Sequence, residues 1–147
     1  MAHDLLATTP YGTTAFRRRA PFGFGNLMRR IESTDPEGGT ERIEYYTHLA
    51  PGQTATVPVN EVPTGFADLN TGLDDYVSLR WDKKAMAEAP GTVARATVTR
   101  WLLHAPMSYL TGASTTAQYV PHSVKRPLET RVWYRYPTQY NALEPGT

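Results

Sequence analysis

The stretch GNLMRRIESTDPEGGTERIEYY, at residues 25–46, decides the fold because it places a tight turn between two alternating arms. The turn-forming residues are Asp35, Pro36, Gly38 and Gly39. Asp bonds to its own backbone, Pro presets φ and Gly accepts a positive φ, so the centre of the stretch predicts a chain reversal. These residues are assigned to structure and not to chemistry.

The arms on either side of the turn have a period of two, which is typical of half-buried strands. Alternate positions are Leu27, Ile31, Ile43 and Tyr45 on one side, and Arg30, Glu32, Arg42 and Glu44 on the other. The usual arrangement buries the apolar side and leaves the charged side in water. The stretch therefore predicts a β-hairpin with its apolar side facing the core.

The composition favours strands over helices. The chain has 147 residues with 12 Pro and 11 Gly, and its aromatic residues are 9 Tyr, 4 Phe and 3 Trp. Breakers and aromatic residues in these numbers are typical of short strands, so we predict an all-β chain of antiparallel hairpins in one domain over residues 1–147. Because Cys is absent, disulfides, thiolate metal sites and thiol catalysis are excluded.

The charge is balanced, with 15 Lys and Arg against 14 Asp and Glu. No global field attracts nucleic acid, and we interpret a local arginine cluster as a solvated strand face. The cluster consists of Arg17, Arg18, Arg19, Arg29 and Arg30. We recognise neither an apolar run long enough for a membrane span nor a secretory signal.

Alternation predicts further strands outside the central stretch. They cover residues 13–18, 76–83, 93–104 and 129–136. In residues 76–83 we expect Val77, Leu79 and Trp81 to be buried. Residues 93–104 should pair antiparallel with them, and their mixed pattern indicates a bulge or burial on both faces. In the last strand the side expected to be apolar carries Val132, Tyr134 and Tyr136.

Other regions lack a clear period. Residues 8–12 predict a turn, and residues 84–91 predict a loop or one helical turn. We interpret residues 49–75 as an irregular insertion, with a helical turn around residues 65–73. Residues 105–127 read as a loop with a short strand at 111–119, and residues 138–147 as a frayed tail. Three strand ends, at residues 43–46, 79–82 and 132–136, place an aromatic beside a charge, which predicts an aromatic spine across the sheet.

The central stretch resembles one unit of the RHS/YD-repeat family. A unit has Gly-Asn-x-x-Arg, then Asp-Pro-x-Gly, then a strand ending in Tyr. The corresponding residues are Gly25, Asn26 and Arg29 or Arg30, then Asp35, Pro36 and Gly38, then Glu44, Tyr45 and Tyr46. Further segments look, in order, like a non-repetitive stretch of large bacterial RHS-type proteins. They are residues 8–16, 33–45, 79–91, 99–104 and 125–137.

The resemblance implies that the chain is a slab of a curved β-sheet shell with no catalytic centre of its own. In that family the shell often encloses a toxic C-terminal domain that is delivered to competitor cells. Neither the family's self-cleavage motif nor a toxin domain is recognised here, so the chain resembles an internal or truncated piece. The partners implied are neighbouring repeats or other chains at exposed sheet edges. A secreted or cell-surface location is expected for the parent family.

A carbohydrate-binding module is the alternative function. Its candidate stacking aromatics are Trp81, Trp101, Trp133 and Tyr134, with Tyr140 as a further member. Alternation places Trp81 and Tyr134 on the apolar side of their strands, which favours packing over binding for these two.

Catalysis and metal binding have little support. The histidines, at positions 3, 48, 104 and 122, lack metal-ligand spacing, and Ser108, Ser114 and Ser123 lack a nucleophile elbow. The remaining candidates are the charges Asp82, Lys83, Lys84 and Glu88, and a carboxylate set of Asp35, Asp74 and Asp75. We interpret the first group as surface ion pairs and expect no cofactor.

Overall fold

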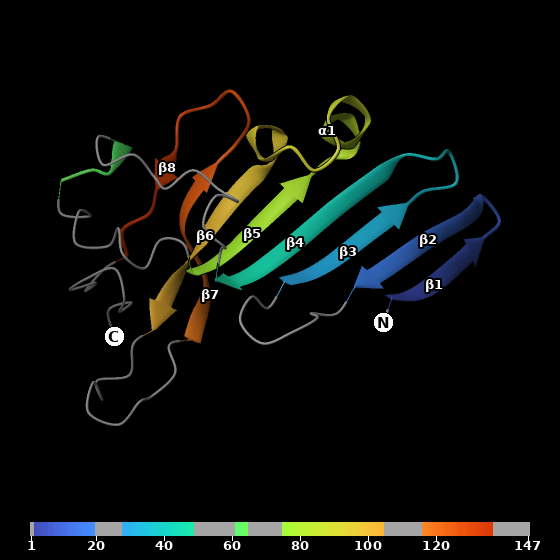
Figure 1. Cartoon of the computed structure of the whole chain (residues 1–147), viewed down its shortest axis with the longest axis horizontal. Helices are drawn as coiled ribbons and strands as arrows, with labels where there is room; N and C mark the ends of the chain where they lie inside the picture. The colour runs from blue at the N-terminus through green and yellow to red at the C-terminus, as the bar shows by residue number, and fades with distance from the viewer. Residues whose placement is uncertain (1, 20–27, 49–60, 65–74, 105–115, 137–147) are drawn as a thin grey trace.

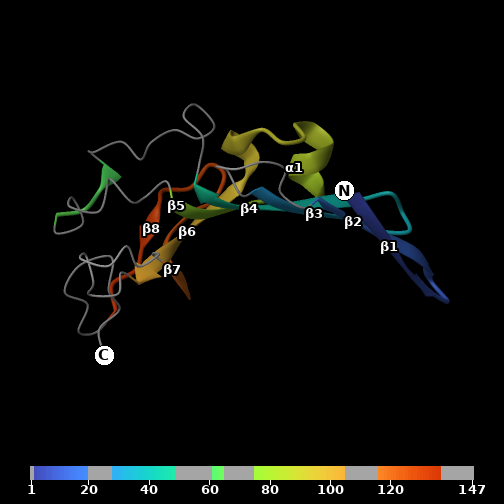
Figure 2. The same ribbon diagram turned by 60° about the horizontal axis from the view of Figure 1, so that its bottom comes forward.

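The computed structural model describes residues 2–19, 28–48, 61–64, 75–104 and 116–136 (Figure 1). These residues form one open antiparallel sheet of eight strands, in which each strand pairs with the next along the chain. The strands are β1 (Ala2–Thr9), β2 (Gly12–Arg19), β3 (Met28–Thr34), β4 (Thr40–His48), β5 (Asp75–Trp81), β6 (Thr97–His104), β7 (Thr116–Lys125) and β8 (Val132–Trp133). Seen edge-on in Figure 2, the sheet is curved. The predicted all-β sheet of antiparallel hairpins is confirmed.

The hairpin of β3 and β4 forms around the predicted turn. Ile31 pairs with Ile43 and Thr34 with Thr40. The Asp35 carboxylate accepts from the Gly39 amide at 2.7 Å, and Gly38 has a φ of 87°. Each turn residue therefore has the role that its chemistry predicts.

The N-terminal hairpin was predicted only in part. The turn before Gly12 and the strand β2 are confirmed, whereas β1 was not predicted. The adjacent Leu5 and Leu6 break the alternation in β1, so no period marks it as a strand. Pairing with β2 holds it in the sheet, since the two strands are in register along their whole length, from Ala2 with Arg19 to Thr9 with Gly12.

Two corrections apply near the C-terminus. Residues 116–125, which the sequence predicted to be mostly loop, form the ten-residue strand β7, and the predicted strand at 129–136 shrinks to β8. Pro121 and the polar residues around it interrupt the alternation of apolar and polar side chains, so the sequence of β7 does not show the period of a strand. Pro121 pairs with Trp101, where the register between β6 and β7 shifts. The predicted bulge in β6 is therefore present, and it accommodates a proline in the sheet.

The sheet has a covered face and an open face. The short helices α1 (Lys83–Glu88) and η3 (Val93–Arg95) pack on the covered face, and Figure 2 shows α1 above the sheet. Their contacts are with the core of Tyr46, Val77, Leu79, Trp81, Ala85, Ala96 and Val98. The burial predicted for β5 and the helical turn predicted after it are both confirmed. Asp82 caps α1 by accepting from the Ala85 amide at 2.8 Å.

The prediction that the hairpin buries its apolar side is wrong. Ile31 and Ile43 are 51% and 47% exposed on the open face, whereas Glu44 is only 4% exposed on the covered face. The cause lies outside the hairpin: Glu44 is in register with Leu79, whose apolar neighbours hold α1 on that side. Leu27 lies outside the described residues.

The predicted aromatic spine is also wrong. The register places Trp81 opposite Arg42 and Tyr46 opposite Val77, while Trp133 lies three strands from β5. In β8 the expected sides are reversed, because Val132 is exposed and Trp133 is half-buried. The helical turn predicted around 65–73, most of the 49–75 insertion and the tail at 138–147 lie outside the described residues.

Candidate functional site

Four charged side chains on the covered face of β3 and β4 form an ion ladder, consisting of Arg30, Glu32, Arg42 and Glu44. Arg30 lies 2.6 Å from the Glu44 carboxylate, and Arg42 lies 2.7 Å from that of Glu32. A second contact of 3.8 Å joins Arg42 to Glu44. The ladder is electrically balanced, which is how charges are held in a partly buried position.

The core and the ion ladder meet at two contacts. The Tyr46 hydroxyl donates to Glu44 at 2.6 Å, and burial together with this carboxylate raises the pKa of Tyr46. The Arg42 guanidinium lies 5.8 Å from the centre of the Trp81 ring. The ladder therefore continues the packing of the core, and its carboxylates are occupied as hydrogen-bond acceptors.

A polar hollow of about 460 Å³ lies between α1 and the strands β2 to β4. Arg17, Glu32 and Lys83 line it, as do the hydroxyls of Thr34 and Thr40, which are 3.1 Å apart. Lys83 forms an ion pair with Asp35, and its hydrogen bond lowers the pKa of that carboxyl. This contact attaches α1 to the β3–β4 turn.

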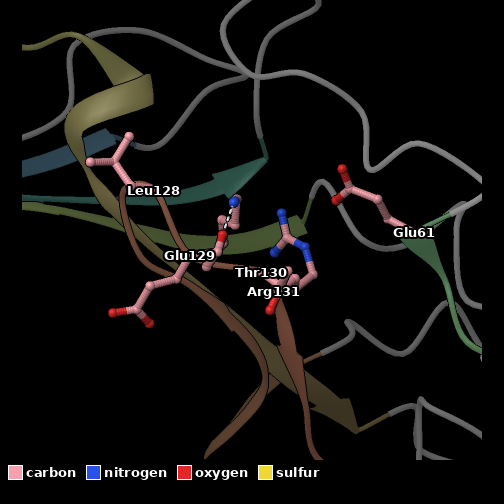
Figure 3. A pocket seen from close by; sticks show the side chains of 6 residues that line it. Glu61, Leu128, Glu129, Thr130 and Arg131 are labelled. Atoms are coloured by element: carbon pink, nitrogen blue, oxygen red, sulfur yellow. Dashed lines mark hydrogen bonds between the residues drawn. The ribbon is translucent and has the colours of Figure 1, made fainter.

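A second hollow, of about 380 Å³, lies beside the segment between β7 and β8 (Figure 3). It is lined by Glu61, Lys125, Leu128, Glu129, Thr130 and Arg131. The Lys125 ammonium donates to the Glu129 carbonyl, and the Glu129 carboxylate points away to Arg126 at 3.3 Å. Burial lowers the pKa of Arg131, and the charge of Glu61 across the hollow opposes this shift. Opposite charges line this hollow, so it has no strong preference for one sign of ligand.

A buried basic group lies near this second hollow. His122 and Arg100 are buried, and Arg131 is half-buried. Burial lowers the pKa of His122 to about 4, and the charges of Arg100 and Arg131 add to the shift. The His122 ring contacts Trp133 edge-on at 5.3 Å. His122 is therefore neutral at neutral pH and packs as a structural side chain.

The aromatics predicted for sugar stacking do not share a surface. Trp81 is 1% exposed on the covered face and donates to the Thr92 carbonyl at 2.8 Å. Trp101 is half-buried on the open face and donates to Ser78 at 2.7 Å. Trp133 packs against His122, and Tyr134 is exposed. A stacking platform that includes Trp81 is thus incompatible with the structure; Tyr140 lies outside the described residues.

The charged candidates for catalysis have structural partners. Asp82 caps α1, Lys83 binds Asp35, and Glu88 lies 3.8 Å from Lys84 and 3.5 Å from Arg95. Ser123 is fully buried. Across the described ranges, no group of three His, Asp or Glu residues is placed to hold a metal ion. Asp74 falls outside these ranges.

The predicted arginine cluster is divided between the two faces. Arg17 and Arg30 form ion pairs on the covered face, whereas Arg18 and Arg29 are exposed on the open face. Sequence reasoning missed the ion ladder as a buried feature. Alternating Arg and Glu on the two arms of one hairpin was the available signal, because opposite charges in register pair across strands.

Comparisons with protein-family models, with curated proteins and with solved structures found no match to this chain. In the part of the chain that the structure describes, no helix has the length and apolar character needed to cross a membrane.

Proposed function

We propose that this chain is a structural and interaction segment, which adds its sheet to a larger β-sheet wall. The observation that carries the proposal is the chain-ordered meander with the eight-residue strand β1 at its edge. Among the described residues no strand pairs with the outer side of β1. Its residues 4–9 are all exposed.

The outer side of β1 has backbone groups available for pairing. The Thr8 and Thr13 hydroxyls are 3.0 Å apart, a closeness typical of a pair without backbone hydrogen bonds between its members. The amides of Thr8, and by the period of two those of Leu6 and Asp4, then point away from β2. A long edge strand with such groups is a template for another strand.

The resemblance to RHS/YD repeats supports the same proposal. A repeat of that kind is a hairpin that pairs laterally with its neighbours, as the β3–β4 hairpin pairs with β2 and β5. In this proposal the segment has no catalytic centre. Enclosure of a toxin and its delivery between competing bacteria would be functions of the parent assembly, at the cell surface or outside the cell.

Sedimentation velocity over a range of concentrations tests the proposal. We expect the chain to associate, and Leu6→Pro to weaken association because proline removes an outward amide. Leu6→Thr is the matched control, since it shortens the side chain and keeps the amide. A compact monomer at every concentration, with one cooperative unfolding transition, would show that the chain is a self-contained domain.

A further inference from the structure

An apolar stripe crosses the open face. It consists of Leu5, Phe16, Ile31 and Ile43, all of them exposed. Leu5 pairs with Phe16 and Ile31 with Ile43. Phe16 pairs with Ser33, two residues from Ile31, so the two pairs are diagonal neighbours and the stripe is continuous.

The length of this open-face stripe follows from sheet geometry. It crosses three strand spacings and one two-residue step, which gives about 16 Å. That length equals about three turns of an α-helix. α1 and η3 pack on the other face, and no described helix lies over the stripe.

The charges beside the stripe are mainly positive. Arg18 is in register with Ile31, and Arg29 lies two residues from Ile31 on the same strand. Arg80, at the β5 end, is in register with Ile43. Glu41 is the one acidic residue with a described side chain beside these arginines, and it lies 3.6 Å from Arg80.

We propose that the open face binds an amphipathic, acidic helix of a partner protein. The apolar ridge of the helix would lie on the open-face stripe, and carboxylates along one flank would reach Arg18 and Arg29. Guanidinium groups suit this task because they bind carboxylates through two parallel hydrogen bonds. A second copy of this chain fits less well, because its own arginines would meet those of the first.

This surface is distinct from the outer edge of β1, so the inference goes beyond the proposed function. Edge pairing uses backbone groups in the plane of the sheet, whereas the helix would contact side chains on one face. Leu6→Pro should therefore leave helix binding unchanged. Failure of either proposal can be observed without failure of the other.

Two labelled peptides test the inference by fluorescence anisotropy with the full chain. One is a helical peptide of about four turns with a leucine ridge and glutamates along one flank, and its match has lysine in place of each glutamate. We expect saturable binding of the acidic peptide, at least ten-fold tighter than that of the lysine peptide. Added salt should weaken this binding, because the arginines are exposed.

Variants of the open face localise the binding. Ile31→Thr and Ile43→Thr should each weaken it about ten-fold, since each removes exposed apolar area and keeps a β-branched side chain. Arg18→Glu combined with Arg29→Glu should transfer the preference to the lysine peptide. Leu6→Thr is the matched control, because Leu6 is equally exposed on β1 but lies on the other face.

Three results of the binding experiment would overturn the inference. They are no binding of either peptide, equal binding of both, and acidic binding that survives the isoleucine variants while circular dichroism shows them folded. A dimer that is lost in Ile31→Thr would also overturn it, since the occupant would then be a second copy of this chain.

Discussion

The hairpin β3–β4 and the neighbouring strand pair β5–β6 bury opposite kinds of side chain on the same face of the sheet, although β3, β4 and β5 all alternate clearly. On the covered face the first pair of strands has the ion ladder, and the second has Val77, Leu79 and Val98. The two sets are in register, since Glu44 pairs with Leu79. Alternation therefore defines two faces, but the element that packs on the sheet decides which of them is buried.

The largest loss of stability should come from a substitution in the apolar core of β5 and β6. Trp81→Ala removes a fully buried ring and should reduce the free energy of unfolding by about 3–5 kcal/mol. Ile43→Ala, on the open face, should cost less than about 0.5 kcal/mol. Urea denaturation measures both. Equal losses would mean that the open face is buried as deeply as the core.

Acid should destabilise the packing around the buried His122 of β7. The pKa of His122 is about 4 in the folded chain against 6.5 for the free side chain, so between these values the unfolded chain binds more protons. Stability is therefore complete above pH 6.5 and decreases as the pH falls towards 4. The full loss is about 3 kcal/mol from this pKa difference.

Urea denaturation at a series of pH values measures this loss. His122→Gln removes the titrating group, and its unfolding free energy should depend less on pH between 6.5 and 4. Other carboxyl groups titrate in both proteins, so the difference between them isolates His122. Identical pH profiles would show that this imidazole is accessible to protons in the folded chain.

A substitution in the ion ladder of β3 and β4 should cause an intermediate loss of stability. Glu44→Ala leaves Arg30 and the Tyr46 hydroxyl without their acceptor and should cost about 2 kcal/mol, less than a fully buried pair because Arg30 is in contact with solvent. Glu41→Ala is the control, since this half-buried residue pairs with Arg80 on the open face, away from the ion ladder. A loss below about 0.5 kcal/mol for both variants would show that the ladder is solvated.

The smallest effect should come from the turn that joins the ladder strands. Gly38 has a φ of 87° with open space where a Cβ would lie, so Gly38→Ala meets backbone strain alone. We expect a cost of about 1 kcal/mol. Glu37→Ala, at the neighbouring position, should be near neutral. Differential scanning calorimetry compares the two, and a neutral Gly38→Ala would show that the turn relaxes.

The sequence predicted those elements whose own residue types and alternation specify their structure. The turn at Asp35 to Gly39, the buried side of β5 and the bulge in β6 all follow from residue type and period. The strand β1 was missed because Leu5-Leu6 break the period. Of β7 only residues 116–119 fell within the short strand predicted at 111–119, because Pro121 interrupts the pattern beyond them. Pairing with neighbouring strands stabilises both strands. Tertiary contacts of that kind leave no trace in a local pattern.

The candidate site was less predictable than the fold. Trp81 was a candidate for sugar stacking although alternation favoured its burial, and the structure shows the core residues that cover its ring. The proximity of His122, Arg100 and Arg131 depends on the pairing of three strands, β6 to β8. The spacing of these residues in the sequence does not encode that proximity.

Amide hydrogen exchange at the outer edge of β1 tests the central claim most directly. The amides of Leu6 and Thr8 should exchange rapidly in dilute solution and become protected as concentration rises, while those of Leu5 and Ala7 stay protected by β2 throughout. This result would show that another strand pairs with the outer edge of β1 when the chains associate. Rapid exchange of Leu6 and Thr8 at every concentration would contradict the account, because no strand would then be added there.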